Sequence, residues 1–308
     1  MSDKSTSNMR TVRTIAELRL RLDPLATDLQ ATIGFVPTMG YLHEGHESLI
    51  REARRRDRVV VLSIFVNPLQ FGPNEDFERY PRDEHNDVRL AEAAGADIVF
   101  IPDVAEIYPV WPLQTVVRAG EAASRYCGAS RPGHFDGVAT VVAKLFHMVR
   151  PHRAYFGLKD AQQVAIIEQM VADLNMPVHI VGCPTVREPD GLAKSSRNVY
   201  LHAEERSQAA VLSAALKEAE QLMRNGQSAE QIERATRSRI EQMPLAQIDY
   251  VAVAAYPSLQ PLAAGATAAE AARMSPDGRV IVLLAVKFGS TRLIDNRIFK
   301  LTEVGIHV

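Results

Sequence analysis

The run VVVLSIFV at residues 59–66 constrains the fold more than any other part of the sequence. It is almost continuously apolar and rich in β-branched residues, which is typical of a central strand covered on both faces. A similar run, ATIGFV at 31–36, precedes it, and the segment between them places Leu49, Ile50 and Ala53 on one helical stripe. These segments predict a strand–helix–strand unit whose ligands bind at the carboxyl ends of parallel strands.

The same alternation continues along the first part of the chain. Further strands are expected at 97–101, 153–157 and 178–182, and further helices at 87–94, at 138–149 and from a cap at Asp160 to Leu174. This order predicts an α/β fold, a Rossmann-like doubly wound parallel sheet.

The pattern changes after the stretch REPDGLAKSSRN at residues 187–198, where Pro and Gly interrupt any regular element. We therefore expect a nucleotide-binding domain over 1–186 and a smaller α+β domain over 187–308. The second domain is expected to contain helices at 203–225 and 228–242, strands at 248–256 and 280–288, and a flexible Ala/Gly-rich loop at 262–279.

The composition excludes several classes of protein. A formal net charge of −2 argues against a general nucleic-acid binder. Five arginines between 51 and 58 form a basic run, which we interpret as the solvated end of a helix. No apolar run is long enough to cross a bilayer, and residues 1–10 are expected to be a frayed leader. Cys127 and Cys183 lack metal-type spacing, so free thiols in a reducing, cytoplasmic compartment are expected.

An HxGH motif, His43 to His46, gives the strongest chemical signal, because it lies where the first predicted strand ends and a helix begins. Free backbone N–H groups and the helix dipole at such a start favour anions, and two imidazoles add directed donors. Gly45 lets a ligand approach the backbone closely, as Gly40 does in the preceding turn. The alternative is a pair of ordinary surface histidines, and the position at the carboxyl edge of a strand favours function.

Two further clusters have the chemistry of phosphate binding. Lys159 follows a predicted strand and can neutralise phosphate charge, whereas its neighbour Asp160 is explained equally well as a helix cap. The segment 194–197 alternates cations with serine hydroxyls, although alone it would be typical of a solvated loop. Gln70 follows the strand at 59–66 and offers both a donor and an acceptor.

These motifs together resemble the pantoate–β-alanine ligases, a family of HxGH nucleotidyltransferases related to class I aminoacyl-tRNA synthetases. The resemblance covers nearly the whole chain from about Ile33. It is carried by FVPTMGYLHEGHESL, SIFVNPLQFGPNEDFERYPR, RPGHFDGVATVV, YFGLKDAQQ, TVREPDGLAKSSRNVYL and TRLIDN.

The resemblance implies the condensation of pantoate with β-alanine, with ATP cleaved to AMP and pyrophosphate and Mg²⁺ accompanying ATP. Pantoyl adenylate would form first, and the β-alanine amine would then attack its acyl carbon. The family also implies a smaller C-terminal domain that closes over the cleft, which would protect the adenylate from water, and a homodimer.

The resemblance assigns roles to individual residues. His46, His43 and Lys159 would be catalytic, Gln70 and Gln163 would hold pantoate, and Asp87 is expected to bind the metal. The residues that match the family's ATP contacts are Met39, Gly40, Tyr41, Leu42, His43, Glu44, Gly45, His46, Gly157, Leu158, Lys159, Asp160, Val186, Lys194, Ser195, Ser196 and Arg197. Asn67, Tyr80, Arg131 and His134 lie in matching segments without a secure individual role.

Two positions depart from the family pattern. Leu158 stands where Glu is usual, and Lys194 stands where Met or Leu is commoner. Lys194 is interpreted either as an additional phosphate contact or as a surface lysine.

Three other functions compete with ligation. A transferase with the same motif would make a stable nucleotidyl product, and a binding module would have lost its chemistry. A dehydrogenase is disfavoured because no GxGxxG follows the first predicted strand.

Overall fold

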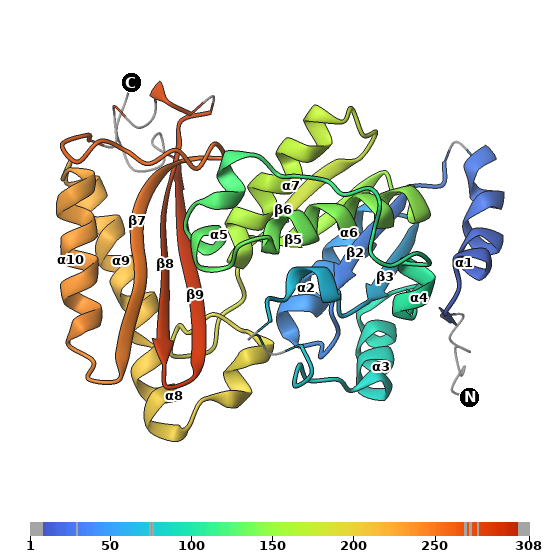
Figure 1. The fold of residues 1–308 in the computed structure, drawn as a ribbon, viewed down its shortest axis with the longest axis horizontal. Coiled ribbons are helices and arrows are strands. Elements are labelled where there is room, and N and C mark those ends of the chain that lie inside the picture. Colours follow the sequence, from blue (N-terminus) through green and yellow to red (C-terminus); the bar gives the residue numbers. More distant parts are fainter. Residues whose placement is uncertain are drawn as a thin grey trace, which may run out of the picture. The chain divides into compact units, whose positions relative to one another are not determined.

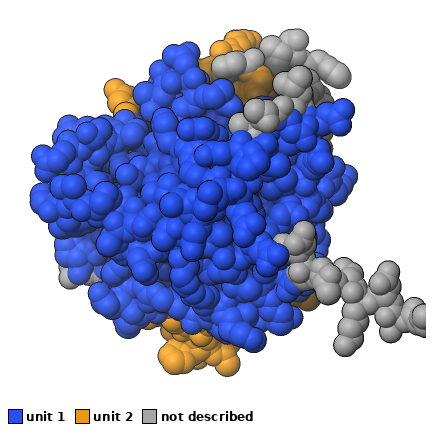
Figure 2. All heavy atoms as spheres, turned by 90° about the vertical axis from the view of Figure 1, so that its right-hand side faces the viewer, with its two compact units in different colours: residues 1–119, 133–158, 166–184 blue, residues 120–132, 159–165, 185–308 orange. Residues whose placement is uncertain are grey.

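The computed structural model describes residues 9–300 except 29, 74, 76, 268, 269, 271, 272 and 276. The chain divides into two compact units, coloured blue and orange in Figure 2. Unit 1 comprises 1–119, 133–158 and 166–184, and unit 2 comprises 120–132, 159–165 and 185–308. The last change of unit falls beside the expected boundary at 186, but the two internal segments 120–132 and 159–165 belong to unit 2, which a single boundary does not describe.

Unit 1 is built on a six-stranded parallel sheet with the order β1-β4-β3-β2-β5-β6 (Figure 1). The strands are β1 (Arg10–Val12), β2 (Ile33–Thr38), β3 (Val59–Ile64), β4 (Ile98–Phe100), β5 (Arg153–Gly157) and β6 (His179–Cys183). The order reverses between β2 and β5, so the carboxyl ends of these two strands form the switch point at which such sheets bind ligands.

Helices cover both faces of this sheet, which confirms the doubly wound α/β prediction. The helical elements before residue 184 are α1 (Ile15–Leu22), η1 (Asp23–Thr27), α2 (Glu44–Arg56), η2 (Pro68–Gln70), α3 (Glu84–Ala94), α4 (Val104–Ile107), η3 (Glu121–Ser124), α5 (Cys127–Ser130), α6 (His134–Val149), η4 (Leu158–Asp160) and α7 (Ala161–Asp173). On one face Ile50 of α2 and Ala91 of α3 pack against Leu62 and Val99. On the other face Phe146 of α6 meets Phe35 edge-on, with the ring centroids 6.4 Å apart.

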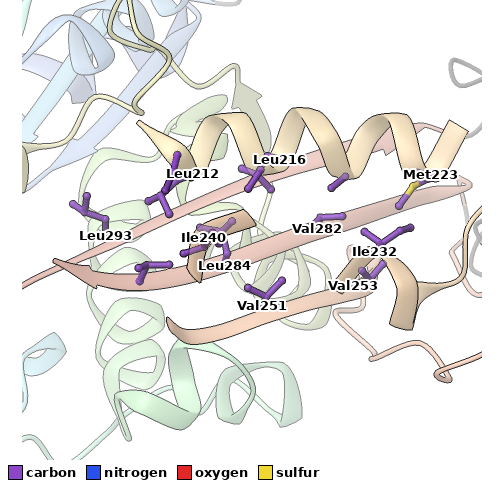
Figure 3. Close-up of a cluster of buried hydrophobic side chains, with 14 of the residues drawn as sticks. Leu212, Leu216, Met223, Ile232, Ile240, Val251, Val253, Val282, Leu284 and Leu293 are labelled. Carbon is purple, nitrogen blue, oxygen red and sulfur yellow. The ribbon is translucent and has the colours of Figure 1, made fainter. Parts of the chain in front are cut away.

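Unit 2 is built on the antiparallel sheet β7-β8-β9, formed by Ala246–Tyr256, Arg279–Phe288 and Thr291–Lys300. Its helical elements after residue 184 are η5 (Ser196–Tyr200), α8 (Ala203–Ala209), α9 (Val211–Arg224) and α10 (Ala229–Glu241). Figure 3 shows the core between α9, α10 and one face of the sheet, where Leu216 and Ile232 meet Val253 and Leu284. The opposite face packs against residues 161 and 165.

Most of the expected strands and helices are present, with local differences. The expected helix 203–225 is divided into α8 and α9 at Ala210, although the torsions of this residue, φ −60° and ψ −20°, are helical. The elements β1, α1 and β9 were not expected, since β1 and α1 are short and β9 carries a buried Asp–Asn pair that hides its alternation. Arg10 of the expected leader begins β1, and residues 1–8 lie outside the described residues, as do five positions of the loop 262–279.

Candidate functional site

The turn after β2 is held in an unusual backbone conformation by a buried carboxylate. Gly40 and Tyr41 both have positive φ, 84° and 51°. Asp87 of α3 is 1% exposed, and its two oxygens accept the backbone N–H groups of Tyr41 (2.8 Å) and Leu42 (2.6 Å). Burial raises the pKa of Asp87, and the two backbone donors oppose this rise. The carboxylate therefore shapes the predicted ATP-binding turn.

The two histidines of HxGH cap their own helix. The Nδ1 of His43, the N-cap of α2, accepts the backbone N–H of Gly45 (3.1 Å), and the Nδ1 of His46 accepts that of His43 (3.3 Å). The ring centroids are 4.1 Å apart. Since Nδ1 is the acceptor in both rings, each neutral ring carries its proton on Nε2. The motif thus combines two imidazole donors with a helix N-terminus, an arrangement that suits a phosphate.

Gln70 lies in a buried network after β3, 9% exposed. Its Nε2 donates to the Sδ of Met39 (3.0 Å), and its Oε1 accepts from Nδ2 of Asn67 (3.1 Å). The same Asn67 amide donates to the carbonyl of Gly137 (3.1 Å), and its Oδ1 accepts the hydroxyl of Tyr108 (2.7 Å). Burial raises the pKa of Tyr108 well above its ordinary value, so this hydroxyl stays a donor. The amide of Gln70 is therefore oriented by its hydrogen bonds to Met39 and Asn67.

Sequence reasoning left part of this network without a role. Asn67 was only in a matching segment, as was His134, whose Nδ1 lies 2.7 Å from the carbonyl oxygen of Gln70. Tyr108 was missed altogether, because a tyrosine in an irregular segment gives no signal of its own. A signal for Asn67 was present in the sequence, since Asn67 is followed by Pro68 and an Asn–Pro pair after a central strand is typical of a functional loop.

Gly157 ends β5, and Leu158 begins η4 directly after it. A Cβ at Gly157 would meet no atom within 4 Å, so there is open space over this backbone. The side chain of Leu158 lies against Gly182 of β6, where a Cβ would come within 2.9 Å of its Cδ2. Leu158, one of the two expected departures from the family pattern, thus packs as an ordinary apolar side chain.

Lys159 and Asp160, which belong to unit 2, form an ion pair with an Nζ–Oδ2 distance of 3.6 Å. Asp160 ends η4 immediately before α7, as the expected helix start requires. In the next turn the buried amide of Gln162 binds the backbone N–H of Cys127 and the carbonyls of residues 122 and 125. Gln162 is therefore structural, whereas Gln163 is partly exposed and has the accessibility that a substrate contact needs.

The serine-rich loop follows a short hairpin of unit 2. Val186 accepts the backbone N–H of Lys194 (2.9 Å), and the Nζ of Lys194 lies 3.2 Å from Oε2 of Glu188. Ser195 caps η5 by accepting the backbone N–H of Arg197 (3.3 Å). Because Lys194 is paired with Glu188, an additional phosphate contact would have to compete with that carboxylate.

The candidate residues fall into two groups, one in each unit. Unit 1 holds residues 39–46, Gln70, Asp87 and residues 157–158. Unit 2 holds Lys159, Asp160, Gln163, Val186 and residues 194–197. Within unit 1 the structure brings Met39 to Gln70 and Asp87 to the turn at 40–42. Within unit 2 it brings Val186 to Lys194.

Four further features were considered in the sequence, and each can be examined in the described part of the chain. No group of three or more His, Cys, Asp or Glu side chains in it could hold a metal ion, and none of its helices is long and apolar enough to cross a membrane. The basic run is paired with acidic neighbours, as in Arg54–Asp97 (2.8 Å) and Arg58–Asp28 (2.8 Å). Both cysteines are free thiols, as predicted.

The chain matches known proteins over almost its whole length. The family model described as pantoate-beta-alanine ligase matches residues 10–298. The pantothenate synthetase of Geobacillus kaustophilus is 55% identical over 275 residues, 89% of this chain and 88% of that protein. That of Acetivibrio thermocellus is 53% identical over 289 residues, 94% of this chain and 98% of that protein.

Solved structures agree with these sequence matches. The crystal structure of pantothenate synthetase from Thermus thermophilus is 46% identical with a TM-score of 0.84, covering 94% of this chain and 99% of that one. A pantoate-beta-alanine ligase from Francisella tularensis, complexed with beta-gamma ATP and beta-alanine, is 34% identical with a TM-score of 0.74 and covers 94% and 97%.

Proposed function

The chain belongs to the pantoate-beta-alanine ligase family, and we propose that it joins pantoate to β-alanine as pantothenate while ATP is cleaved to AMP and pyrophosphate. The match over residues 10–298 carries this proposal. It is supported by the 55% identity to a pantothenate synthetase and by the nucleotide and β-alanine named for the related Francisella structure. A transferase that retains the nucleotide in its product is not favoured by these relatives.

The reaction is proposed to run in two balanced steps. A carboxylate oxygen of pantoate attacks the α-phosphorus, the bond to the bridging oxygen breaks, and pyrophosphate leaves. The amine of β-alanine then attacks the acyl carbon, AMP leaves with the adenylate oxygen, and the amine loses a proton. His43 and His46 would donate Nε2–H bonds to phosphate oxygens, and Lys159 would offset the negative charge that develops.

The remaining candidate residues are proposed to bind ATP or pantoate. Gln70, oriented by Asn67, and Gln163 would hold pantoate through its hydroxyls and carboxylate. Backbone groups of residues 39–46, 157–160 and 186 and the loop 194–197 would contact ATP, as the family motifs imply.

Mg²⁺ is proposed to arrive with ATP and to offset its phosphate charge. Mg²⁺ usually keeps several waters and is held by few carboxylates together with substrate phosphates. The earlier expectation of Asp87 as a metal ligand stays a prediction without geometric support, because both Asp87 oxygens accept backbone N–H groups.

An assay of AMP formation tests the proposed function. With ATP and Mg²⁺, the protein should release AMP when pantoate and β-alanine are both present, and pantoate alone should support exchange of labelled pyrophosphate into ATP. His46→Ala and Lys159→Ala should abolish adenylate formation while the circular dichroism spectrum stays unaltered. A labelled nucleotide retained in the product would refute ligation, and full turnover by either variant would refute the role of that residue.

A homodimer and a cytoplasmic location are also proposed. Val110, Trp111 and Val116 are 59%, 61% and 52% exposed within one short segment of unit 1, an apolar surface that a second copy could cover. Sedimentation equilibrium of the protein and of Trp111→Ser tests the dimer. Two free thiols support a reducing compartment.

A further inference from the structure

Two adjacent residues of β9, Asp295 and Asn296, have no role in the proposed reaction although they lie in the motif TRLIDN. Both are polar and buried, 2% and 8% exposed, in the middle of the strand. A buried Asp and Asn cost free energy unless their polar atoms are bonded. Their partners therefore indicate what they do.

Asp295 holds the hairpin that carries Val186. Its Oδ2 and Oδ1 accept from the Nη1 and Nη2 of Arg187 at 2.6 and 2.9 Å, a two-pronged pair that fixes the guanidinium plane. Arg187 also donates to the carbonyl of Gly191 (3.0 Å), and it forms a bridge with Ala193. The ion pair thus binds β9 to the hairpin whose two arms meet at the Arg187–Ala193 bridge and from which the loop 194–197 emerges.

Asn296 holds the backbone of Lys159. Its Nδ2 donates to the carbonyl oxygen of Lys159 at 2.8 Å. Its own backbone N–H donates to Oδ1 of Asp295 (2.8 Å), so the two residues are also linked to each other. Lys159 lies within the short helix η4, and a bond at its carbonyl limits how far its backbone can move.

The two side chains point to opposite faces of the sheet, as neighbours in a strand do. Asp295 is paired with Leu284, which belongs to the core under α9 and α10, whereas Asn296 is paired with Leu283, which packs with residues 161 and 165. We propose that Asp295 and Asn296 are positioning residues: from the two faces of β9 they hold the serine-loop hairpin and Lys159 in one fixed arrangement for ATP.

This inference rests on the proposed function, and a first assay shows whether a failure belongs to the inference or to the function itself. The unaltered protein is first assayed for pantoate-dependent pyrophosphate exchange. If it shows none, the proposed function fails. If it is active, the affinity for ATP is measured by calorimetry, which also works with variants that do not turn over.

A double-mutant cycle tests Asn296. Asn296→Leu keeps a side chain of similar shape, introduces no charge and removes the donor to the Lys159 carbonyl. The Kd for ATP should therefore rise about tenfold, the scale of one lost hydrogen bond. In a Lys159→Ala background the same substitution should raise the Kd by less than about twofold, because it acts through Lys159. An equal rise in both backgrounds, or no rise in either, overturns the inference.

Asp295→Asn tests the other face and should also raise the Kd for ATP about tenfold, with Arg187→Lys as a second variant that keeps the charge but loses the two-pronged geometry. Arg297→Ala is the matched control, since Arg297 is the next residue of β9 and pairs with Glu220 of α9. The control should bind ATP normally. Weakened binding in the control, or normal binding in both Asp295→Asn and Arg187→Lys, refutes a positioning role for Asp295.

Discussion

Gly45 shows how a single hydrogen atom decides the geometry of the HxGH motif. A Cβ at this position would lie 2.8 Å from Cε1 and 2.9 Å from Nδ1 of His43, so the imidazole would have to move. Helix propensity alone would favour Ala over Gly by about 1 kcal/mol. In Gly45→Ala the cost of moving the imidazole and the gain in helix propensity should roughly cancel, so the melting temperature should be almost unaltered. Pyrophosphate exchange should nevertheless fall about 100-fold, the loss typical of a reacting group displaced by about 1 Å.

Gly265→Ala is the control for this substitution, since a Cβ there meets nothing within 4 Å. It should exchange pyrophosphate at the rate of the unaltered protein. If Gly45→Ala does the same, the reciprocal cap of His43 and His46 does not matter for the reaction.

Asp87 provides a second prediction at the scale of one residue. Asp87→Asn replaces one acceptor by an NH₂ group that faces a backbone N–H of Tyr41 or Leu42, so one buried donor loses its partner at about 1–3 kcal/mol. Urea denaturation should show this loss of stability, and kcat/KM for ATP should fall. If Asp87 instead held a metal, added Mg²⁺ would restore the variant, which is the result that contradicts the role in the turn.

The sequence singles out the residues of the first motif as a candidate anion site, but it does not show how they contact one another. Strand end, glycine and imidazole are visible in the spacing of Gly40, His43 and His46, and physical chemistry links that pattern to anions. Their reciprocal hydrogen bonds and the carboxylate under the turn depend on side-chain geometry and on α3, a separate and later segment of the chain. No local pattern reports such contacts.

At the scale of elements, α6 and η2 meet through a glycine. A Cβ on Gly137 would lie 2.3 Å from the carbonyl oxygen of Leu69 and 2.9 Å from the backbone N of Gln70. Neither backbone atom can yield without moving η2. Gly137→Ala should therefore lower the melting temperature, despite the about 1 kcal/mol that Ala gains in a helix, because overpacking costs about 1–3 kcal/mol.

The same substitution should affect the binding of pantoate more than that of ATP, because η2 carries Gln70, the residue proposed to hold pantoate. Steady-state kinetics should show a raised KM for pantoate and a nearly normal KM for ATP. A variant with unaltered stability and kinetics would show that η2 adjusts freely and that its contact with α6 does not position Gln70.

The elements themselves differ in how well the sequence predicts them. The predicted strands β2 and β3 are confirmed. They were visible in the sequence because a strand covered on both faces is apolar at nearly every position. β9 was not foreseen, because Asp295 and Asn296 interrupt its apolar pattern and are buried through bonds to Arg187 and Lys159. In a sequence, two adjacent polar residues are typical of a loop, and only the structure shows the partners that allow them to be buried in a strand.

The division of the whole chain follows contacts between segments that are distant in sequence. Residues 159–165 follow β5 closely but belong to unit 2, because Asn296 binds the Lys159 carbonyl and Ala161 and Ala165 pack with Leu283. A boundary placed where composition changes cannot include such a segment. Through these contacts Lys159 belongs to unit 2, although the expected first domain spans its position.

For the whole molecule, buried acids predict how stability depends on alkaline pH. Burial, and after it the charge of Glu52, raises the pKa of the Cys183 thiol from 9.0 to about 11, and burial raises that of Tyr126 from 10.0 to about 12. The unfolded chain therefore loses these protons at a lower pH than the folded protein. The contribution of these protonated groups to the free energy of unfolding is fully present below pH 9. It should decrease as the pH rises toward 11, by roughly 2–3 kcal/mol for the two-unit shift of Cys183.

Urea unfolding at several pH values measures this decrease. Because Cys183 lies in unit 1, the unfolding of that unit is followed with a spectroscopic probe placed outside β6. Cys183→Ala removes the thiol, and although it lowers stability at every pH by leaving a small cavity, its stability should decrease less steeply between about pH 9 and 11. The difference in slope isolates the proton that the folded protein retains, since the other titrating groups are shared by the two proteins. Parallel curves would mean that the Cys183 thiol titrates alike in the folded and unfolded chains, and the burial of β6 would then not govern its ionisation.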